Sequence, residues 1–208
     1  MAKGPSANEP DDEFRLMVSH VVPPEMQAAW GAPDTTVGSW AEYQLVGGPT
    51  DEQHPLRVRF AVVPPSFKDD RLWFEVRANY IVGGLTILGL FRGDPTQPKR
   101  IERLLLKHAG QAALEIPLLG LGIEVVLPRP LRSDVKIKRS PAETVEVPAG
   151  KFRAERLVHA GSLPETAWYS HDVPLFGLVK IERGRQTVVL VGSGRAGATP
   201  DIDPGSGE

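Results

Sequence analysis

The sequence contains no cysteine, and this absence excludes disulfide bonds, thiolate metal sites and cysteine nucleophiles. No apolar stretch reaches the roughly 18–20 residues of a membrane-spanning helix, and residues 1–6 lack the apolar core of a secretory signal. An excess of one charge is also lacking, because the formal net charge is −2 over 208 residues. The chain therefore has no global electrostatic attraction to nucleic acid or anionic lipid, and nucleic acid is not an expected partner.

These absences leave the cellular compartment open. As written, the chain is expected to be cytoplasmic, because no export signal is visible in it. A mature exported protein whose leader had been replaced by a start methionine would have the same sequence, and that protein would be periplasmic or associated with the outer membrane. Cysteine content does not decide between the two, because proteins of oxidising compartments can also lack cysteine.

Glycine and proline are abundant, with 21 and 20 residues, and they separate short hydrophobic runs. This distribution is typical of many short strands joined by turns. Apolar and polar residues alternate from Trp40 to Leu45, from Leu56 to Val62 and from Leu72 to Tyr80. The alternation predicts a meander with one buried face and one solvent-facing side, on which carboxylates such as Glu75 stay hydrated. Strands do not alternate with long helices, which argues against a doubly wound nucleotide-binding fold.

The most hydrophobic stretch is residues 81–91, which Gly83, Gly84 and Gly89 interrupt. The first interpretation is a bent strand buried on both faces, with glycine where the sheet curves. The alternative is a flexible apolar flap over a cavity, which would need the same glycines. Residues 118–123 are also apolar and interrupted by glycine.

The predicted fold is mainly β, a strongly curved antiparallel sheet of about 9–11 strands that forms a half-open barrel. Helical spacing within residues 11–23 and 24–30 predicts a short helical segment before the sheet. A single β-rich domain is expected over residues 13–192. Residues 1–12 and 193–208 contain too little apolar surface to order themselves, and both are predicted to be disordered tails.

Two local patterns have the residue types of a reactive site without its context. Gly192–Gly197 matches G-x-G-x-x-G after a strand, but too little chain follows for the helix and second strand of a dinucleotide site. Ser170, His171 and Asp172 have the residue types of a hydrolase triad, yet adjacent residues point in different directions and a polar turn explains them. The five histidines show no metal-ligand spacing. We therefore expect no enzymatic activity, cofactor or metal; a hydrolase using outward carboxylates or His171 is a third alternative.

The second half of the chain carries a more specific pattern. Residues 143–154 read ETVEVPAGKFRA, residues 168–174 read WYSHDVP, and residues 176–180 read FGLVK. Physically, residues 148–150 make a tight reversal that returns an aromatic side chain, Phe152, to the face of the preceding valines. With residues 37–43 (VGSWAEY), these motifs make the chain from about Gly38 to Gly192 similar to uncharacterised bacterial envelope domains related to the LolA/LolB lipoprotein-carrier superfamily.

The resemblance implies a strongly curved antiparallel sheet wrapped on a helix, whose concave face holds acyl chains in the carrier members. The chain lacks the export signal and the lipobox cysteine of typical members. We accordingly expect a non-enzymatic envelope protein that binds a lipid or lipoprotein acyl chain; the alternative is a structural or adaptor subunit that docks on a larger protein assembly without a ligand. The candidate apolar lining, chosen for its parity and from the glycine-interrupted segments, is Phe60, Phe74, Tyr80, Leu85, Leu88, Phe91, Leu119 and Leu121.

Overall fold

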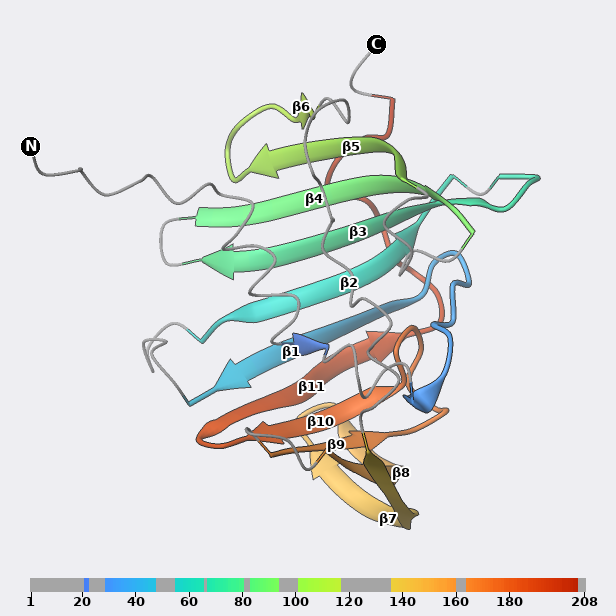
Figure 1. Ribbon diagram of the computed structural model, residues 1–208. Coiled ribbons are helices and arrows are strands. Elements are labelled where there is room, and N and C mark those ends of the chain that lie inside the picture. The colour runs from blue at the N-terminus through green and yellow to red at the C-terminus, as the bar shows by residue number, and fades with distance from the viewer. Residues whose placement is uncertain are drawn as a thin grey trace, which may run out of the picture.

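The protein forms one large antiparallel sheet. The computed structural model describes residues 21–22, 29–47, 55–65, 67–80, 83–93, 101–116, 136–159 and 164–205. The strands are β1 (Trp40–Val46), β2 (Arg57–Val63), β3 (Arg71–Tyr80), β4 (Gly83–Arg92), β5 (Ile101–His108), β6 (Leu114–Glu115), β7 (Ile137–Val147), β8 (Gly150–His159), β9 (Glu165–Tyr169), β10 (Leu178–Arg183) and β11 (Gln186–Gly194). Their order in the sheet is β6-β5-β4-β3-β2-β1-β11-β10-β9-β8-β7. The sheet is strongly curved and not closed (Figure 1), which confirms the predicted fold class.

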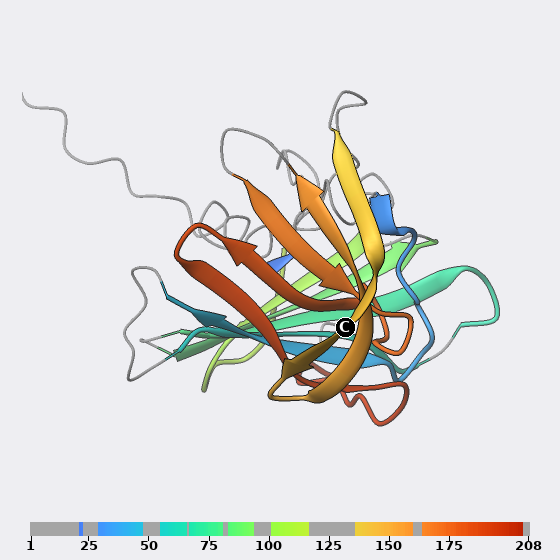
Figure 2. The ribbon, with the colours of Figure 1, turned by 90° about the horizontal axis from the view of Figure 1, so that it is seen from below.

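Two sequential meanders make up this sheet. Strands β1–β6 pair in chain order, strands β7–β11 do the same, and β1 joins β11 antiparallel with Trp40 opposite Gly194 and Val46 opposite Thr187. Figure 2 shows β7–β10 turning away from the layer of β2–β5, so that the sheet folds over on one side. The concave face thus collects side chains from both meanders.

Strand β4 decides between the bent strand and the flexible flap for residues 83–91, which the structure describes. It pairs along its whole length with β3, from Gly83 opposite Tyr80 to Arg92 opposite Arg71, and its central residues are buried on both faces. The buried strand is therefore confirmed and the flexible flap is wrong. Gly89 is needed because the ring of Phe91 lies where a Cβ atom would be.

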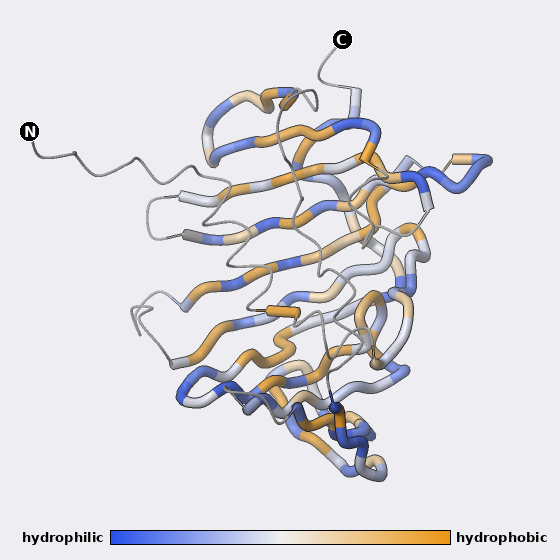
Figure 3. The backbone as a smooth tube through the Cα atoms, in the orientation of Figure 1, coloured by the Kyte–Doolittle hydropathy of each residue, from blue (hydrophilic) through white to orange (hydrophobic). Residues whose placement is uncertain are grey.

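The edge strand β7 contains a proline, Pro141, near its middle. It is one strand whose register against β8 shifts between Ser140 and Glu143, across Pro141. Proline is tolerated there because β7 is the outermost strand and the shift relieves the ladder. Hydrophilic residues predominate on β7 and β8 (Figure 3), and most of β7 is exposed.

Both faces of the β2–β5 region are covered. The main core lies on the concave face, with residues of β1–β5, β8–β11 and the β9–β10 connection. A second apolar cluster lies on the convex face, where Ala198 and Ile202 are 5% and 1% exposed. The prediction of a disordered tail from residue 193 is therefore wrong for residues 193–205, and the expected solvent-facing side of the meander is partly buried.

The C-terminal segment, defined as residues 195–205, causes this second burial. In Figure 1 it leaves β11, passes behind β3–β5 and ends near β6. The predicted helical segments and the tail at residues 1–12 lie almost entirely outside the described residues. Of that region Val21 and Val22 are described, and both are buried in the main core. Among the described residues only Val21, Ala29 and Trp30 are helical, and no helix there has the length and apolar character to cross a membrane.

Gly177 illustrates how tightly the β9–β10 connection packs, and it supplies a first prediction. Trp30 stacks on Tyr169 with ring centroids 5.3 Å apart. Gly177 has φ +71°, and a Cβ atom on it would overlap the indole nitrogen of Trp30. We expect Gly177→Ala to lower the free energy of unfolding by about 2–4 kcal/mol, since strain and overlap add.

The control for this change is Gly184→Ala. Gly184 has φ +57° but nothing within 4 Å of an added Cβ, so only the backbone strain of about 1 kcal/mol is expected there. Urea unfolding followed by circular dichroism measures both variants. Equal losses at the two positions would contradict the role of the Trp30 contact.

Candidate functional site

The concave face holds a cluster of aromatic side chains. The ring of Phe60 lies 5.1 Å from that of Phe176 and 6.3 Å from that of Phe74, and Phe74 lies 6.3 Å from Phe91. These four side chains are at most 2% exposed. The structure therefore brings together three residues of the predicted lining, and it fills the space between them with Phe176.

The remaining members of the predicted lining are distributed differently. Leu85 belongs to the same concave core, whereas Leu88 packs in the convex cluster. Three residues apart on one strand, the two leucines must point to opposite faces, so assigning Leu88 to the same surface is wrong. Tyr80 is described only through its backbone, which pairs with Gly83. Leu119 and Leu121 lie outside the described residues.

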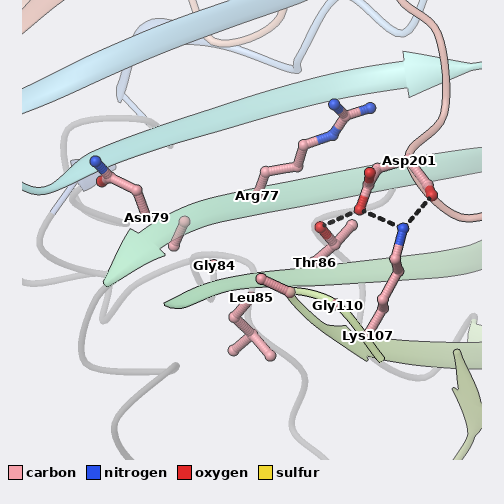
Figure 4. Close-up of a pocket in the computed structure, with 10 residues that line it drawn as sticks. Arg77, Asn79, Gly84, Leu85, Thr86, Lys107, Gly110 and Asp201 are labelled. Carbon is pink, nitrogen blue, oxygen red and sulfur yellow. Dashed lines mark hydrogen bonds and ion pairs between the residues drawn. The ribbon is translucent and has the colours of Figure 1, made fainter. Parts of the chain in front are cut away.

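A pocket of about 370 Å³ opens where β3 ends and β4 begins (Figure 4). It lies beside the C-terminal segment. Its lining residues are Arg77, Ala78, Asn79, Gly84, Leu85, Thr86, Lys107, Ala109, Gly110 and Asp201. In Figure 4 the side chains of Thr86 and Lys107 point toward Asp201, while Leu85 points the other way. Leu85 thus both lines the pocket and belongs to the concave core.

Asp201 is the anionic group of this pocket. Its carboxylate accepts a hydrogen bond of 2.8 Å from the Thr86 hydroxyl and lies 3.2 Å from Lys107 Nζ. Burial alone would raise the pKa of Asp201, but the bonds from Thr86 and Lys107 outweigh it and hold the pKa below its usual value. The group is therefore ionised at neutral pH and fixed in place.

Glu75 is a charged residue that sequence reasoning placed in solvent. Its side chain is 1% exposed, and it accepts a bond of 2.5 Å from Arg77 Nε and one of 2.7 Å from the Asp201 backbone N–H. A second cation lies nearby: burial first, and then the charge of Arg77, lower the pKa of Arg59, while Glu75 opposes that shift. Glu75 thus compensates two guanidinium groups and caps a backbone amide at once.

A signal for this burial was present in the sequence. On the strand face that carries Glu75, the neighbouring strands present Ala61 and Leu88 directly opposite it, and Trp73 stands two residues before it. A face with large apolar residues beside a single carboxylate indicates a covered surface better than a hydrated one.

The side chains of β3 and β5 hold the C-terminal segment mainly by its backbone. Arg77 donates to the Thr199 carbonyl at 2.6 Å, Lys107 to the Asp201 carbonyl at 2.9 Å and Arg103 to the Pro204 carbonyl at 3.1 Å. Together with the Glu75 bond, four backbone groups of the segment receive side-chain partners.

The local patterns that resemble reactive sites have structural roles here. The Ser170 hydroxyl accepts a hydrogen bond from the Asp172 N–H at 3.3 Å, as in a turn. The His171 ring is tilted against that of Trp30, with ring centroids 4.5 Å apart. Gly194 is needed because a Cβ atom there would come within 2.7 Å of the Trp40 indole nitrogen. Within the described ranges no group of three or more His, Asp and Glu side chains is placed to hold a metal ion.

Residues 143–180, which carry the sequence motifs, form one connected structural unit. Gly150 takes φ +135° in the reversal, and Phe152 pairs directly with Val145, as expected from the sequence. Trp168 Nε1 donates to the Glu143 carboxylate at 2.5 Å, which links the first motif to the second. These residues shape the curved half of the sheet.

No protein-family model matches the sequence, and no curated protein sequence matches it. Two solved structures show a distant likeness. One is a "putative lipoprotein" from Parabacteroides distasonis, with a TM-score of 0.40 and 11% identity over 79% of this chain and 100% of that one. The other is a "putative exported protein" with a YmcC-like fold from Bacteroides fragilis, with a TM-score of 0.35 and 11% identity over 78% and 98%.

Neither likeness assigns the chain to a family. At these TM-scores and identities, similarity establishes neither a shared fold nor a shared function. The resemblance to the LolA/LolB superfamily therefore stays a prediction.

Proposed function

We propose that this protein is a non-enzymatic envelope protein that binds an apolar ligand, a lipid or lipoprotein acyl chain, against the concave face of its sheet. The observation that carries the proposal is the shape of that face: a curved, unclosed sheet lined by one apolar core from both meanders. The resemblance of residues 38–192 to envelope carrier domains supports the location, and the structural roles of Ser170 and His171 support the absence of catalysis.

The packing of the aromatic cluster favours a ligand position at one end of the concave face. The rings of Phe60, Phe74 and Phe176 already pack against one another, so an acyl chain beside them would have to displace a ring. Leu85 instead combines membership of the apolar core with the lining of an open pocket. We therefore place the entry of the ligand at the Leu85 end of β4.

A variant at Gly84 tests this entry site, because Gly84 lines the same pocket as Leu85 from the strand face that carries Thr86. A Cβ atom there would make ordinary contacts, 3.7 Å from the Ala78 carbonyl oxygen and 3.9 Å from Ala109 Cβ. Gly84→Leu should fill the pocket without backbone strain, and we expect uptake of a fluorescent fatty acid to weaken about tenfold or more, with no loss of thermal stability.

Arg153→Leu is the matched control, because it adds the same side chain to an exposed strand position on β8. Its fatty-acid uptake should equal that of the wild type. Equal uptake by Gly84→Leu and wild type would reject the entry site. Absence of both fatty-acid uptake and co-purifying lipid in mass spectra of the wild type would reject the proposed function itself.

The second candidate is an adaptor that docks on a larger assembly without a ligand. The dense packing of Phe60, Phe74, Phe91 and Phe176 favours it, because a filled interior needs no occupant. Isolation of one stoichiometric protein partner, without bound lipid, would favour this candidate over the first.

A further inference from the structure

We propose that the convex face of β3–β5 is a peptide-binding site, occupied in this chain by its own C-terminal segment. The convex-face site is defined by its apolar residues and by its polar residues. These are Ala61, Trp73, Leu88, Leu90 and Leu105, and Glu75, Arg77, Thr86, Arg103 and Lys107. The site lies on the opposite face from the aromatic cluster, and it shares Arg77, Thr86 and Lys107 with the lining of the pocket beside Gly84. Its test measures peptide binding and is therefore separate from the test of fatty-acid uptake.

The convex-face site binds the backbone of the segment as well as its side chains. Thr199, Asp201 and Pro204 each offer a carbonyl oxygen to a cation of β3 or β5, at 2.6–3.1 Å. Glu75 accepts the Asp201 amide, which is the complementary contact. Backbone contacts of this kind give affinity that depends little on the side chains of the bound segment.

Three side chains of the segment, at spaced positions, would determine which peptide sequences the site accepts. Ala198 and Ile202, four residues apart, insert into the apolar cluster. Asp201, directly before the isoleucine, bonds Thr86 and Lys107 through its carboxylate. The chemistry of the site therefore fits a segment with a small apolar residue, two variable residues, an aspartate and a branched apolar residue.

The buried charge of Glu75 also favours a binding site over a purely structural core. A carboxylate that is 1% exposed is costly unless its partners are present, and one partner of Glu75 is an amide supplied by the segment. A core built only for stability would more simply place an apolar residue at that position. Glu75 instead provides an acceptor aimed at a passing backbone. A partner protein that carries the same pattern would displace the C-terminal segment and bind in its place.

The test uses the full-length chain and a fluorescently labelled peptide with the sequence of residues 196–205. Ile202→Asp should release the segment and open the site. Fluorescence anisotropy should then show the peptide binding this variant about tenfold or more tightly than the wild type, in which the site is occupied. A peptide carrying the same Ile-to-Asp change, and the double variant Ile202→Asp with Glu75→Gln, should each bind at least several-fold more weakly.

Each of the two experiments, with Ile202→Asp and with the cleaved chain, has results that would overturn the proposal. A folded Ile202→Asp protein that does not bind the peptide would overturn the proposal. Equal binding of the unchanged peptide and the peptide with the Ile-to-Asp change would also overturn it. If Ile202→Asp does not fold, a protease site inserted between Ala196 and Gly197 of the otherwise wild-type chain replaces it; both residues are exposed. After cleavage the fragment should stay bound and exchange with the labelled peptide. Unfolding on cleavage, or failure to exchange, would show that the segment is part of the core and would overturn the proposal.

Discussion

Replacing Glu75 with alanine is expected to lower the free energy of unfolding by about 2–4 kcal/mol. The change leaves the Asp201 amide without its acceptor and removes a buried carboxylate that compensates the charges of Arg59 and Arg77. Because the Arg77 side chain is 30% exposed, water solvates part of its charge, and the expected loss is below that of a fully buried pair. Urea unfolding at neutral pH measures the effect.

Glu75→Gln separates charge from shape. The amide retains an oxygen that can accept the Asp201 N–H, so its loss should be about half of that seen with alanine. Asp69→Ala is the surface control, because Asp69 also pairs with an arginine, Arg71, but at an exposed position, and no measurable change in stability is expected there. A Glu75→Ala protein as stable as the Asp69→Ala protein would contradict the role of the buried carboxylate.

Replacing Phe60 with alanine is expected to cost about 3–5 kcal/mol, the usual range for removing a fully buried aromatic side chain. Phe60 is completely buried and touches the rings of Tyr43, Phe74 and Phe176, so its removal opens a cavity that those neighbours cannot all fill. Thermal and urea unfolding of the variant measure the loss.

Phe60→Leu keeps most of the volume and should lose about 1–1.5 kcal/mol. In both variants that remain folded, fatty-acid uptake should match that of the wild type, since the ligand is placed at the Leu85 end of the face. Uptake that falls in Phe60→Leu without a loss of stability would instead return Phe60 to the ligand site.

The strands were predictable because alternation is a local signal. From Trp40 to Leu45 and from Leu72 to Ala78, every second side chain enters the concave core, as the period of two requires. The single strand β7 was less visible, because Pro141 divides its pattern and only the pairing with β8 shows that the strand continues.

The C-terminal segment was missed for a different reason. Between residues 195 and 205 only Ala198 and Ile202 are buried, which is too little apolar surface to indicate order by itself. Its stability comes from partners more than 90 residues away in the chain, such as Arg77 for Thr199 and Arg103 for Pro204. Because the C-terminal segment was not expected to cover the sheet, Glu75 was predicted to be exposed. Parity shows which face a strand residue is on but not what lies over that face.

The pairing of β1 with β11 has a consequence for how the chain reaches this fold. Within each meander, neighbouring strands are also neighbours in sequence, so hairpins can form and extend locally. The contact between Val46 and Thr187 instead closes a loop of about 140 residues, whose entropy must be lost before the contact is gained. We therefore expect two locally assembled halves to meet through one non-local pairing, and we expect that encounter to govern the rate at which the native sheet forms.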